Sequence, residues 1–149
     1  MSDPEFSKTQ YHAVAGTYDT QEGLYVPSND LFQLSFGNNW TDAIENFKDA
    51  IEKVKVIALK TLIKQGNIWI AEAGQSDFTA RLIKAIQLDL PEINVSKRIH
   101  VIQHSDWNEN PTSTESLQFV KENSNDQKIS DGNTVGNGTP GFRDPEYTY

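Results

Sequence analysis

The sequence contains no cysteine. Disulfide bonds and thiolate chemistry are therefore excluded, while the redox state of the compartment is left open. No apolar run approaches the roughly 20 residues that a membrane-spanning helix needs, and the N-terminus lacks the basic-then-apolar pattern of a secretory signal. We therefore expect a cytoplasmic protein that has no membrane partner.

Basic residues are also scarce. The 149 residues include 13 Lys and Arg against 21 Asp and Glu, which gives a formal net charge of −8. A surface of this sign repels the phosphate backbone of nucleic acids and anionic lipids. Nucleic acid is therefore not an expected partner, whereas a small-molecule ligand or a second copy of the chain remains open.

The length is sufficient for one domain with its own hydrophobic core. Residues 1–10 read as a tag remnant or a disordered lead, because Met1 to Phe6 has no recognisable periodicity. Residues 11–133 carry the helix and strand signals, and residues 134–149 form a glycine-rich loop and tail. We predict a single α/β domain over 11–133.

The centre of the chain reads as a strand, a helix and a second strand. Two short apolar runs, 67–73 and 98–103, bracket an amphipathic segment from Phe78 to about Leu88, which is typical of a βαβ unit. Trp69 lies in the middle of the first strand, and we expect it in the core. Parallel strands joined in this way end at the same edge of a sheet.

Further helices are predicted on both sides of this unit. Residues 41–65 have apolar side chains at helical spacing, with Gly66 as the expected C-terminal stop. Thr112 and Glu115 have the spacing of a capping box that opens a helix ending near residue 123. The alternation of elements predicts an open, mostly parallel Rossmann-like sheet with flanking helices.

The remaining segments give weaker signals. Residues 11–15 read as a short strand ended by Gly16, and residues 127–130 as another short strand. Residues 31–36 mix apolar and polar positions and fit either a strand or a single helical turn. The front third of the chain is therefore left open between sheet and irregular structure.

Polar residues follow three of the predicted strands, in segments 72–77, 104–108 and 131–133. Adjacent strands lie about 4.8 Å apart, so these segments can share one crevice. Carboxylates and amides there suit hydroxyl pairs, an indole can stack on a ring, and Asp or Glu oxygens can hold a hard cation such as Ca²⁺. The candidate catalytic residues are Glu72, His104 and Asp106, and the candidate ligand-binding residues are Gln75, Asp77, Trp107, Asn108, Asp131 and Asn133.

Several of these candidates have a structural alternative. A partly buried Glu72 would have a perturbed pKa and mark a site, but it can equally pair with a Lys or Arg. Asp77, with Ser76, can cap the following helix. Asp106 and Asn108 can form hydrogen bonds with their own turns.

Residues 68–79 (IWIAEAGQSDFT) and 99–108 (IHVIQHSDWN) resemble the central part of nucleoside-hydrolase-like proteins, and the resemblance extends over about 67–133. It implies an open α/β fold, a ribosyl or sugar-like ligand at the strand ends, and Ca²⁺ as a cofactor. Active members have an aspartate cluster that binds this metal, and no such cluster occurs here. The chain also has about half the usual length, so a fragment, a degenerate relative and a small domain that kept the scaffold remain open.

Two functions follow from these observations. The first is a nucleoside-hydrolase-like domain that binds a ribosyl or sugar-like ligand, without an assured hydrolytic activity. The second is a non-enzymatic interaction or oligomerisation protein, in which exposed aromatic side chains dock on another chain.

Overall fold

The computed structural model describes residues 6–16 and 29–129. Their fold is an open α/β fold, as the sequence predicts. Among these residues no helix combines the length and the apolar character that crossing a membrane requires. The elements in chain order are β1 Ala13–Ala15, α1 Asn29–Phe36, β2 Trp40–Asp42, α2 Phe47–Ile63, β3 Ile68–Glu72, α3 Asp77–Asp89, α4 Val95–Arg98, β4 Ile99–His104, α5 Ser105–Glu109, α6 Thr114–Asn123 and β5 Asn125–Ile129.

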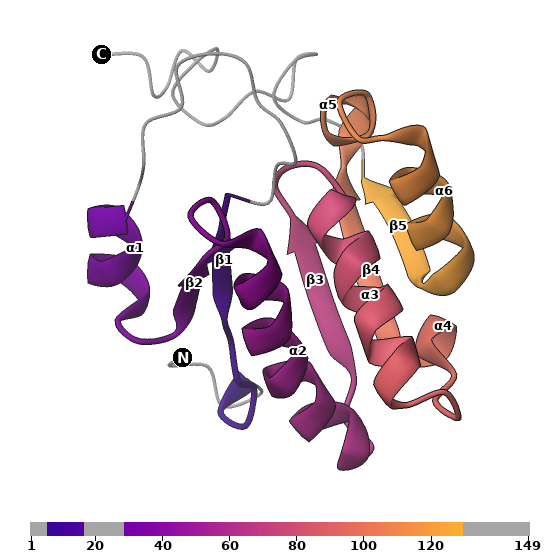
Figure 1. Ribbon diagram of the computed structural model, residues 1–149, viewed down its shortest axis with the longest axis horizontal. Helices are drawn as coiled ribbons and strands as arrows, with labels where there is room; N and C mark the ends of the chain where they lie inside the picture. Colours follow the sequence, from indigo (N-terminus) through magenta and orange to yellow (C-terminus); the bar gives the residue numbers. More distant parts are fainter. Residues whose placement is uncertain (1–5, 17–28, 130–149) are drawn as a thin grey trace, which may run out of the picture.

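The strands form two parallel sheets. β3, β4 and β5 make one sheet in that order, and β1 pairs with β2 in the other. Glu72 at the end of β3 is the register partner of Gln103 on β4, and Gln103 is the partner of Lys128 on β5. All five arrows in Figure 1 point to the same side of the molecule, with β1 and β3 at the facing edges of the two sheets. The convergence of strand ends that the sequence predicts is therefore present for β3, β4 and β5.

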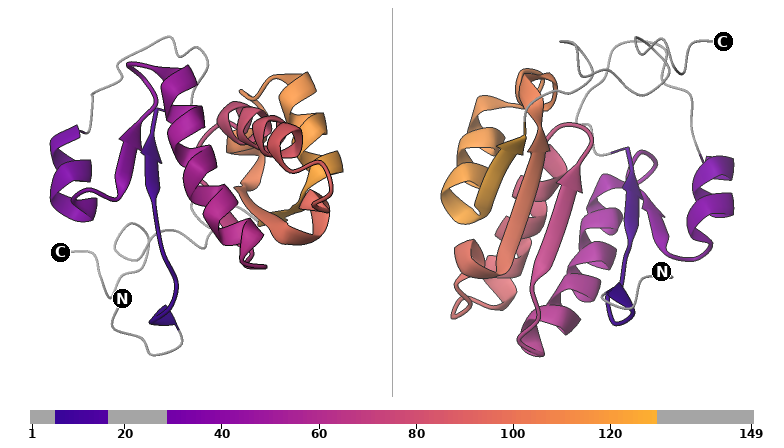
Figure 2. Two further views of the ribbon diagram at one scale, coloured as in Figure 1. Left: turned by 60° about the horizontal axis from the view of Figure 1, so that its bottom comes forward. Right: turned by 180° about the vertical axis from the view of Figure 1, so that it is seen from behind.

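Three helices cover the same face of the three-stranded sheet. α2, α3 and α6 lie in front of it in Figure 1, and none of the described helices covers the opposite face, which is seen from behind in Figure 2. The hydrophobic core lies between the sheet and these helices. Its fully buried side chains include Leu62, Ile83, Ile86, Ile99, Val101 and Val120.

Helix α2 connects the two sheets. It contacts β2, β3 and α3, and its residues Ala50 and Ile51 belong to the same core cluster as Ala43, which follows β2, and Val101 of β4. Gly16 ends β1 with φ +75, and a Cβ at this position would lie 1.9 Å from Cγ1 of Ile44. Glycine is required there because it alone accepts both the left-handed backbone and the close approach.

The predicted start of the long helix was wrong. Thr41 and Asp42 belong to strand β2, and α2 begins at Phe47, where the N-cap Asn46 accepts a hydrogen bond from the Asp49 N–H. Asp42 instead accepts from the Ile44 N–H at 2.8 Å, which forms a turn between strand and helix. The apolar periodicity alone did not reveal that the helix begins only at Phe47.

The end of the long helix differs in detail. Gln65, not Gly66, has the left-handed backbone, with φ 64. The Gln65 N–H donates to the Leu62 carbonyl and the Gly66 N–H to the Thr61 carbonyl, each at 2.9 Å, which is the pattern of a Schellman motif. Gly66 serves close packing, because a Cβ there would lie 2.6 Å from Cγ2 of Thr61.

Three other segments depart from the prediction. Residues 31–36 lie in helix α1. The expected loop 104–108 contains most of helix α5, which begins directly after β4. The N-cap of α6 is Ser113, whose hydroxyl accepts from the Ser116 N–H, and not Thr112, so the proposed capping box of Thr112 and Glu115 is not formed.

The prediction that Trp69 lies in the core was also wrong. Its side chain is 66% exposed, because it projects from the sheet face opposite the helices, as the alternation along β3 requires. The indole stacks on the imidazole of its register partner His100, with ring centroids 4.1 Å apart and planes 11° from parallel.

Candidate functional site

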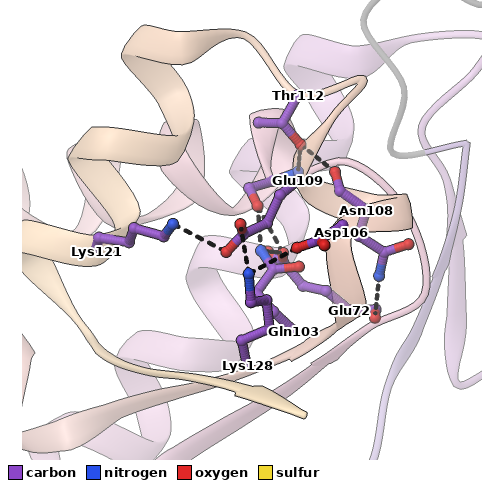
Figure 3. A network of polar contacts seen from close by, with 9 residues as sticks. Glu72, Gln103, Asp106, Asn108, Glu109, Thr112, Lys121 and Lys128 are labelled. Carbon is purple, nitrogen blue, oxygen red and sulfur yellow. Dashed lines mark hydrogen bonds and ion pairs between the residues drawn. The ribbon is translucent and has the colours of Figure 1, made fainter. Parts of the chain in front are cut away.

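Glu72 and Gln103 form a buried polar pair where β3 and β4 end. Glu72 is 8% exposed and Gln103 is fully buried. The Gln103 side-chain amide donates to Oε2 of Glu72 and contacts the hydroxyl of Ser76. The Ser76 hydroxyl donates to the same Glu72 oxygen at 2.8 Å. Figure 3 shows Glu72 and Gln103 side by side beneath α5 and the segment that follows it.

Two oxygens of this pair have no hydrogen-bond donor, although they are buried: Oε1 of Glu72 and Oε1 of Gln103. Burial raises the pKa of the Glu72 carboxyl above its ordinary value, and the charge of Asp126 acts in the same direction. The hydroxyl of Thr79 and the hydrogen bonds from Ser76 and Gln103 oppose this rise. Protonation of Glu72 replaces one of these acceptors with a donor, so it removes one unsatisfied acceptor from the buried pair.

The segment after β4 is bound tightly to the segment after β3. The Asn108 side-chain amide donates to the Glu72 carbonyl at 2.8 Å. The Thr112 hydroxyl donates to the Asn108 carbonyl at 2.6 Å and accepts from the Ser76 N–H at 3.1 Å. These three bonds form a buried link between two loops that lie 36 positions apart in the chain.

Gln75 and Asp77 take part in the same link. The Gln75 amide donates to the Pro111 carbonyl at 2.8 Å, and Asp77 accepts from the Ser113 hydroxyl at 2.7 Å. Ser76 is the N-cap of α3 but makes no capping hydrogen bond with its side chain. The predicted ligand-binding residues Gln75, Asp77 and Asn108 are therefore brought together, and each is bonded within the protein.

The isosteric substitution Thr112→Val tests this link. We expect it to lower the free energy of unfolding by about 1–2 kcal/mol, because it removes one donor and one acceptor from a buried site. Thermal or urea unfolding measures the change. Thr114→Val on the exposed start of α6 is the matched control, with an expected effect within about 0.5 kcal/mol. Equal effects of the two substitutions would contradict a structural role for Thr112.

Asp106 belongs to a set of ion pairs nearer the surface. Lys128 lies 2.7 Å from Asp106 and 3.2 Å from Glu109, and Glu109 is also 2.9 Å from Lys121. Burial alone would raise the pKa of Glu109, but hydrogen bonds from the two lysines outweigh it and leave the pKa below its ordinary value. As Figure 3 shows, this network ties α5 to α6 and β5.

His104 ends β4 on the side of the sheet opposite Gln103, since neighbouring strand residues face opposite ways. Glu72 shares the face of Gln103, its register partner. The three predicted catalytic residues therefore do not converge: Glu72 lies beneath the helices, Asp106 is paired with Lys128, and His104 is on the other face. The Trp107 side chain, and Asp131 and Asn133, lie outside what the structure describes.

Sequence reasoning missed Gln103, Thr112 and Ser76, which complete the buried network. For Gln103 a signal exists, because Ile99, Val101 and Gln103 alternate along one face of the strand, and a polar residue at a core position needs a partner. For Thr112 none exists, since its contact depends on how two distant loops meet.

The described residues do not fit the Ca²⁺ centre that the resemblance implies. Among residues 6–16 and 29–129, no group of three or more His, Cys, Asp or Glu side chains is placed to hold a metal ion. Glu72 and Asp77, the acidic candidates after β3, are both bonded to neighbouring serines.

No family model, no curated protein and no solved structure was found to match this chain.

Proposed function

We propose that this chain is a non-enzymatic interaction domain that docks through the face of its three-stranded sheet that none of the described helices covers. We call this the outer face. The side chains that alternate onto it from β3, β4 and β5 are Trp69, Ala71, His100, Ile102, His104, Asn125, Gln127 and Ile129.

The main support for this proposal is the distribution of charged side chains between the two faces of the sheet. The charged residues of the three strands are Glu72, Asp126 and Lys128, and all of them alternate onto the helix-covered side. None of the described strand residues that alternate onto the outer face is Asp, Glu, Lys or Arg. Soluble sheets normally place charge on the side that meets water, so the reversal favours a partner on the outer face.

Exposure supports the same conclusion. Trp69 is 66% and Ile129 49% exposed on the outer face. Parallel sheets occur almost only with both faces covered, and here the described elements cover one. Aromatic residues and a lack of charge characterise the centre of protein interfaces.

The positions of the predicted catalytic groups favour interaction over hydrolysis. A general base must lie within hydrogen-bond reach of the proton that it removes. Glu72 is enclosed by Gln103 and Ser76, and its backbone carbonyl is covered by Asn108. Reaching Glu72 would require the buried link between the two loops to open.

A second function, binding of a ribosyl or sugar-like ligand at the strand ends, is favoured by one observation. Glu72 and Gln103 each have a buried oxygen without a donor. When Glu72 is ionised, a vicinal diol can supply two hydroxyl donors at this position. This proposal depends on the resemblance to nucleoside-hydrolase-like proteins.

One experiment separates these functions. The purified chain is incubated with inosine, uridine or ribose, with and without Ca²⁺, and both base release and the melting temperature are measured. For an interaction domain we expect neither base release nor a shift. A shift that is absent in Glu72→Gln would support the ligand site, since ligands stabilise the state they bind. Base release that is lost in Asp106→Ala or Glu72→Gln would overturn the proposed function.

A further inference from the structure

We infer that residues 105–113 form a pH-sensitive cover over the carboxyl ends of β3 and β4, which opens when the Glu72 side chain loses its proton. We call these residues the covering segment. They comprise helix α5 and the turn that leads to α6, and they lie over Glu72 and Gln103 in Figure 3. Such a cover acts at the strand ends and not on the outer face, so it is independent of the proposed function.

A closed ring of hydrogen bonds joins the covering segment to Glu72. The Asn108 amide donates to the Glu72 carbonyl at 2.8 Å, and the Asn108 carbonyl accepts from the Thr112 hydroxyl at 2.6 Å. The Ser76 N–H donates to that hydroxyl at 3.1 Å, and the Ser76 hydroxyl donates to Oε2 of Glu72 at 2.8 Å. The backbone and the carboxyl of Glu72 therefore both belong to the ring, so a change at the carboxyl affects the bonds that hold the cover.

The described contacts that hold the covering segment are polar. None of its described side chains belongs to the hydrophobic core cluster. Besides the ring, it is held by the bond from Gln75 to the Pro111 carbonyl and by the ion pairs of Asp106 and Glu109 with Lys128. Segments with few buried apolar contacts open more readily than the core of a protein. The cover can therefore open while the core between the sheet and the helices stays packed.

Ionisation of Glu72 disfavours the closed state. Glu72 is 8% exposed, and its Oε1 and the Oε1 of Gln103 are buried without a donor among the described residues. A buried carboxylate that lacks donors costs far more free energy than a neutral group in the same place. Opening of the cover admits water, which supplies the missing donors. Loss of the proton therefore shifts the balance towards the open form.

Other charged groups modify this effect without replacing it. Those on the elements around Glu72 are Asp77 on α3, Asp106 and Glu109 on α5, Lys121 on α6, and Asp126 and Lys128 on β5. Burial opposes it, but hydrogen bonds from the two lysines keep the pKa of Glu109 below its ordinary value, so its ion pairs are formed where Glu72 ionises. Burial raises the pKa of Asp126 as well, so this residue needs its own control.

Amide hydrogen exchange of the full chain, measured by NMR between about pH 5 and pH 8, tests the inference. The reporter is the Ser76 N–H, whose acceptor Thr112 belongs to the cover. The control is the Ala80 N–H, which donates to the Ser76 carbonyl at 2.8 Å within α3. The protection factor, which is the ratio of the intrinsic to the measured exchange rate, removes the pH dependence of the exchange chemistry itself.

The expected direction follows from the raised pKa of Glu72 in the closed state, for which burial is the main cause. Protonation stabilises the cover fully below the ordinary value of 4.5, and this stabilisation is lost as the pH rises through the closed-state value. Because one proton is involved, we expect the protection factor of Ser76 to fall by up to about 10-fold per pH unit in that window. Ala80 should keep its protection.

Two variants and one change of solvent make the result specific. In Glu72→Gln, which keeps the shape of the side chain but cannot ionise, the protection of Ser76 should be independent of pH. Asp126→Asn is the matched change from carboxylate to amide on β5, and the fall at Ser76 should persist in it. Low concentrations of urea should leave the exchange of Ser76 unchanged, because a local opening exposes little surface.

Three results would overturn the inference. These are a protection of Ser76 that does not change with pH, a fall that persists in Glu72→Gln, and an equal fall at Ala80, which would mean that the whole molecule unfolds. None of them involves base release or the outer face, so failure of the inference is distinguishable from failure of the proposed function.

Discussion

Gln103→Leu is expected to lower the free energy of unfolding by about 2–4 kcal/mol at mildly alkaline pH. The Gln103 amide is the buried donor that joins Glu72 to Ser76. Leucine has a similar volume but no donor, so the Glu72 carboxylate loses a charge-assisted hydrogen bond in a site that water does not reach. Urea unfolding followed by circular dichroism measures the change.

Two comparisons make this result specific. Gln127→Leu is the same substitution on the exposed face of the next strand, and it should change stability by no more than about 0.5 kcal/mol in dilute solution. The cost of Gln103→Leu should also shrink at acidic pH, where a protonated Glu72 carries no charge. A cost that is equal at both pH values would contradict the electrostatic explanation.

Glu72→Gln is expected to raise stability at alkaline pH, by about 1–3 kcal/mol. The introduced amide can donate to Oε1 of Gln103, which otherwise lacks a donor, and an unsatisfied buried polar group costs about 1–3 kcal/mol. The substitution also removes a carboxylate that burial disfavours. Glu72→Ala leaves the Gln103 amide without its acceptor, and it should lower stability at every pH.

The direction of the pH dependence follows from the raised pKa of Glu72. The folded protein holds this proton more tightly than the unfolded chain, whose carboxyl has the ordinary value of 4.5. The resulting stability is complete below pH 4.5 and is lost as the pH rises through the folded value. Glu72→Gln should remove this loss. Part of the slope should remain, because burial also raises the pKa of Asp126.

Denaturation midpoints between pH 4 and 9 check this prediction for the wild type, Glu72→Gln and the double variant with Asp126→Asn. Each added substitution should flatten the alkaline decline further. A decline that is unchanged in both variants would mean that these carboxyls do not bind protons more tightly in the folded state.

The order of helices and strands could be predicted well from the sequence. Which side chains of these elements are buried could be predicted only poorly. Strands β3 and β4 and helix α3 lie within one or two residues of their predicted bounds. Trp69 is the residue whose surroundings differ most from the prediction. It is flanked by Ile68 and Ile70, so the strand appears apolar on both sides, and such a run is typical of a strand covered on both faces. Which face of the strand the helices cover depends on the path of the chain, and it cannot be predicted from the apolar segment alone.

The candidate site was predicted in part. The sequence singled out Glu72 because it ends an apolar strand, where a partly buried carboxylate would have a perturbed pKa, and the structure shows it buried with a raised pKa and without a Lys or Arg partner among the described residues. The partners of Gln75, Asp77 and Asn108 could not be predicted, because they lie 36 positions away and their contacts depend on tertiary structure. A ligand-binding crevice and a polar link closed by internal hydrogen bonds contain the same types of residue. Only the three-dimensional structure shows which of the two is present.

The division of the strands into two sheets has a consequence for how the molecule opens. The β1–β2 pair has no ladder to β3 and is joined to the larger sheet through α2. Its amides therefore belong to a smaller cooperative unit, which can detach while β3, β4 and β5 keep their pairing. Fluctuations of this kind would uncover the edge of β3, which pairs with no described strand on that side, and would leave it open to misassembly with another strand.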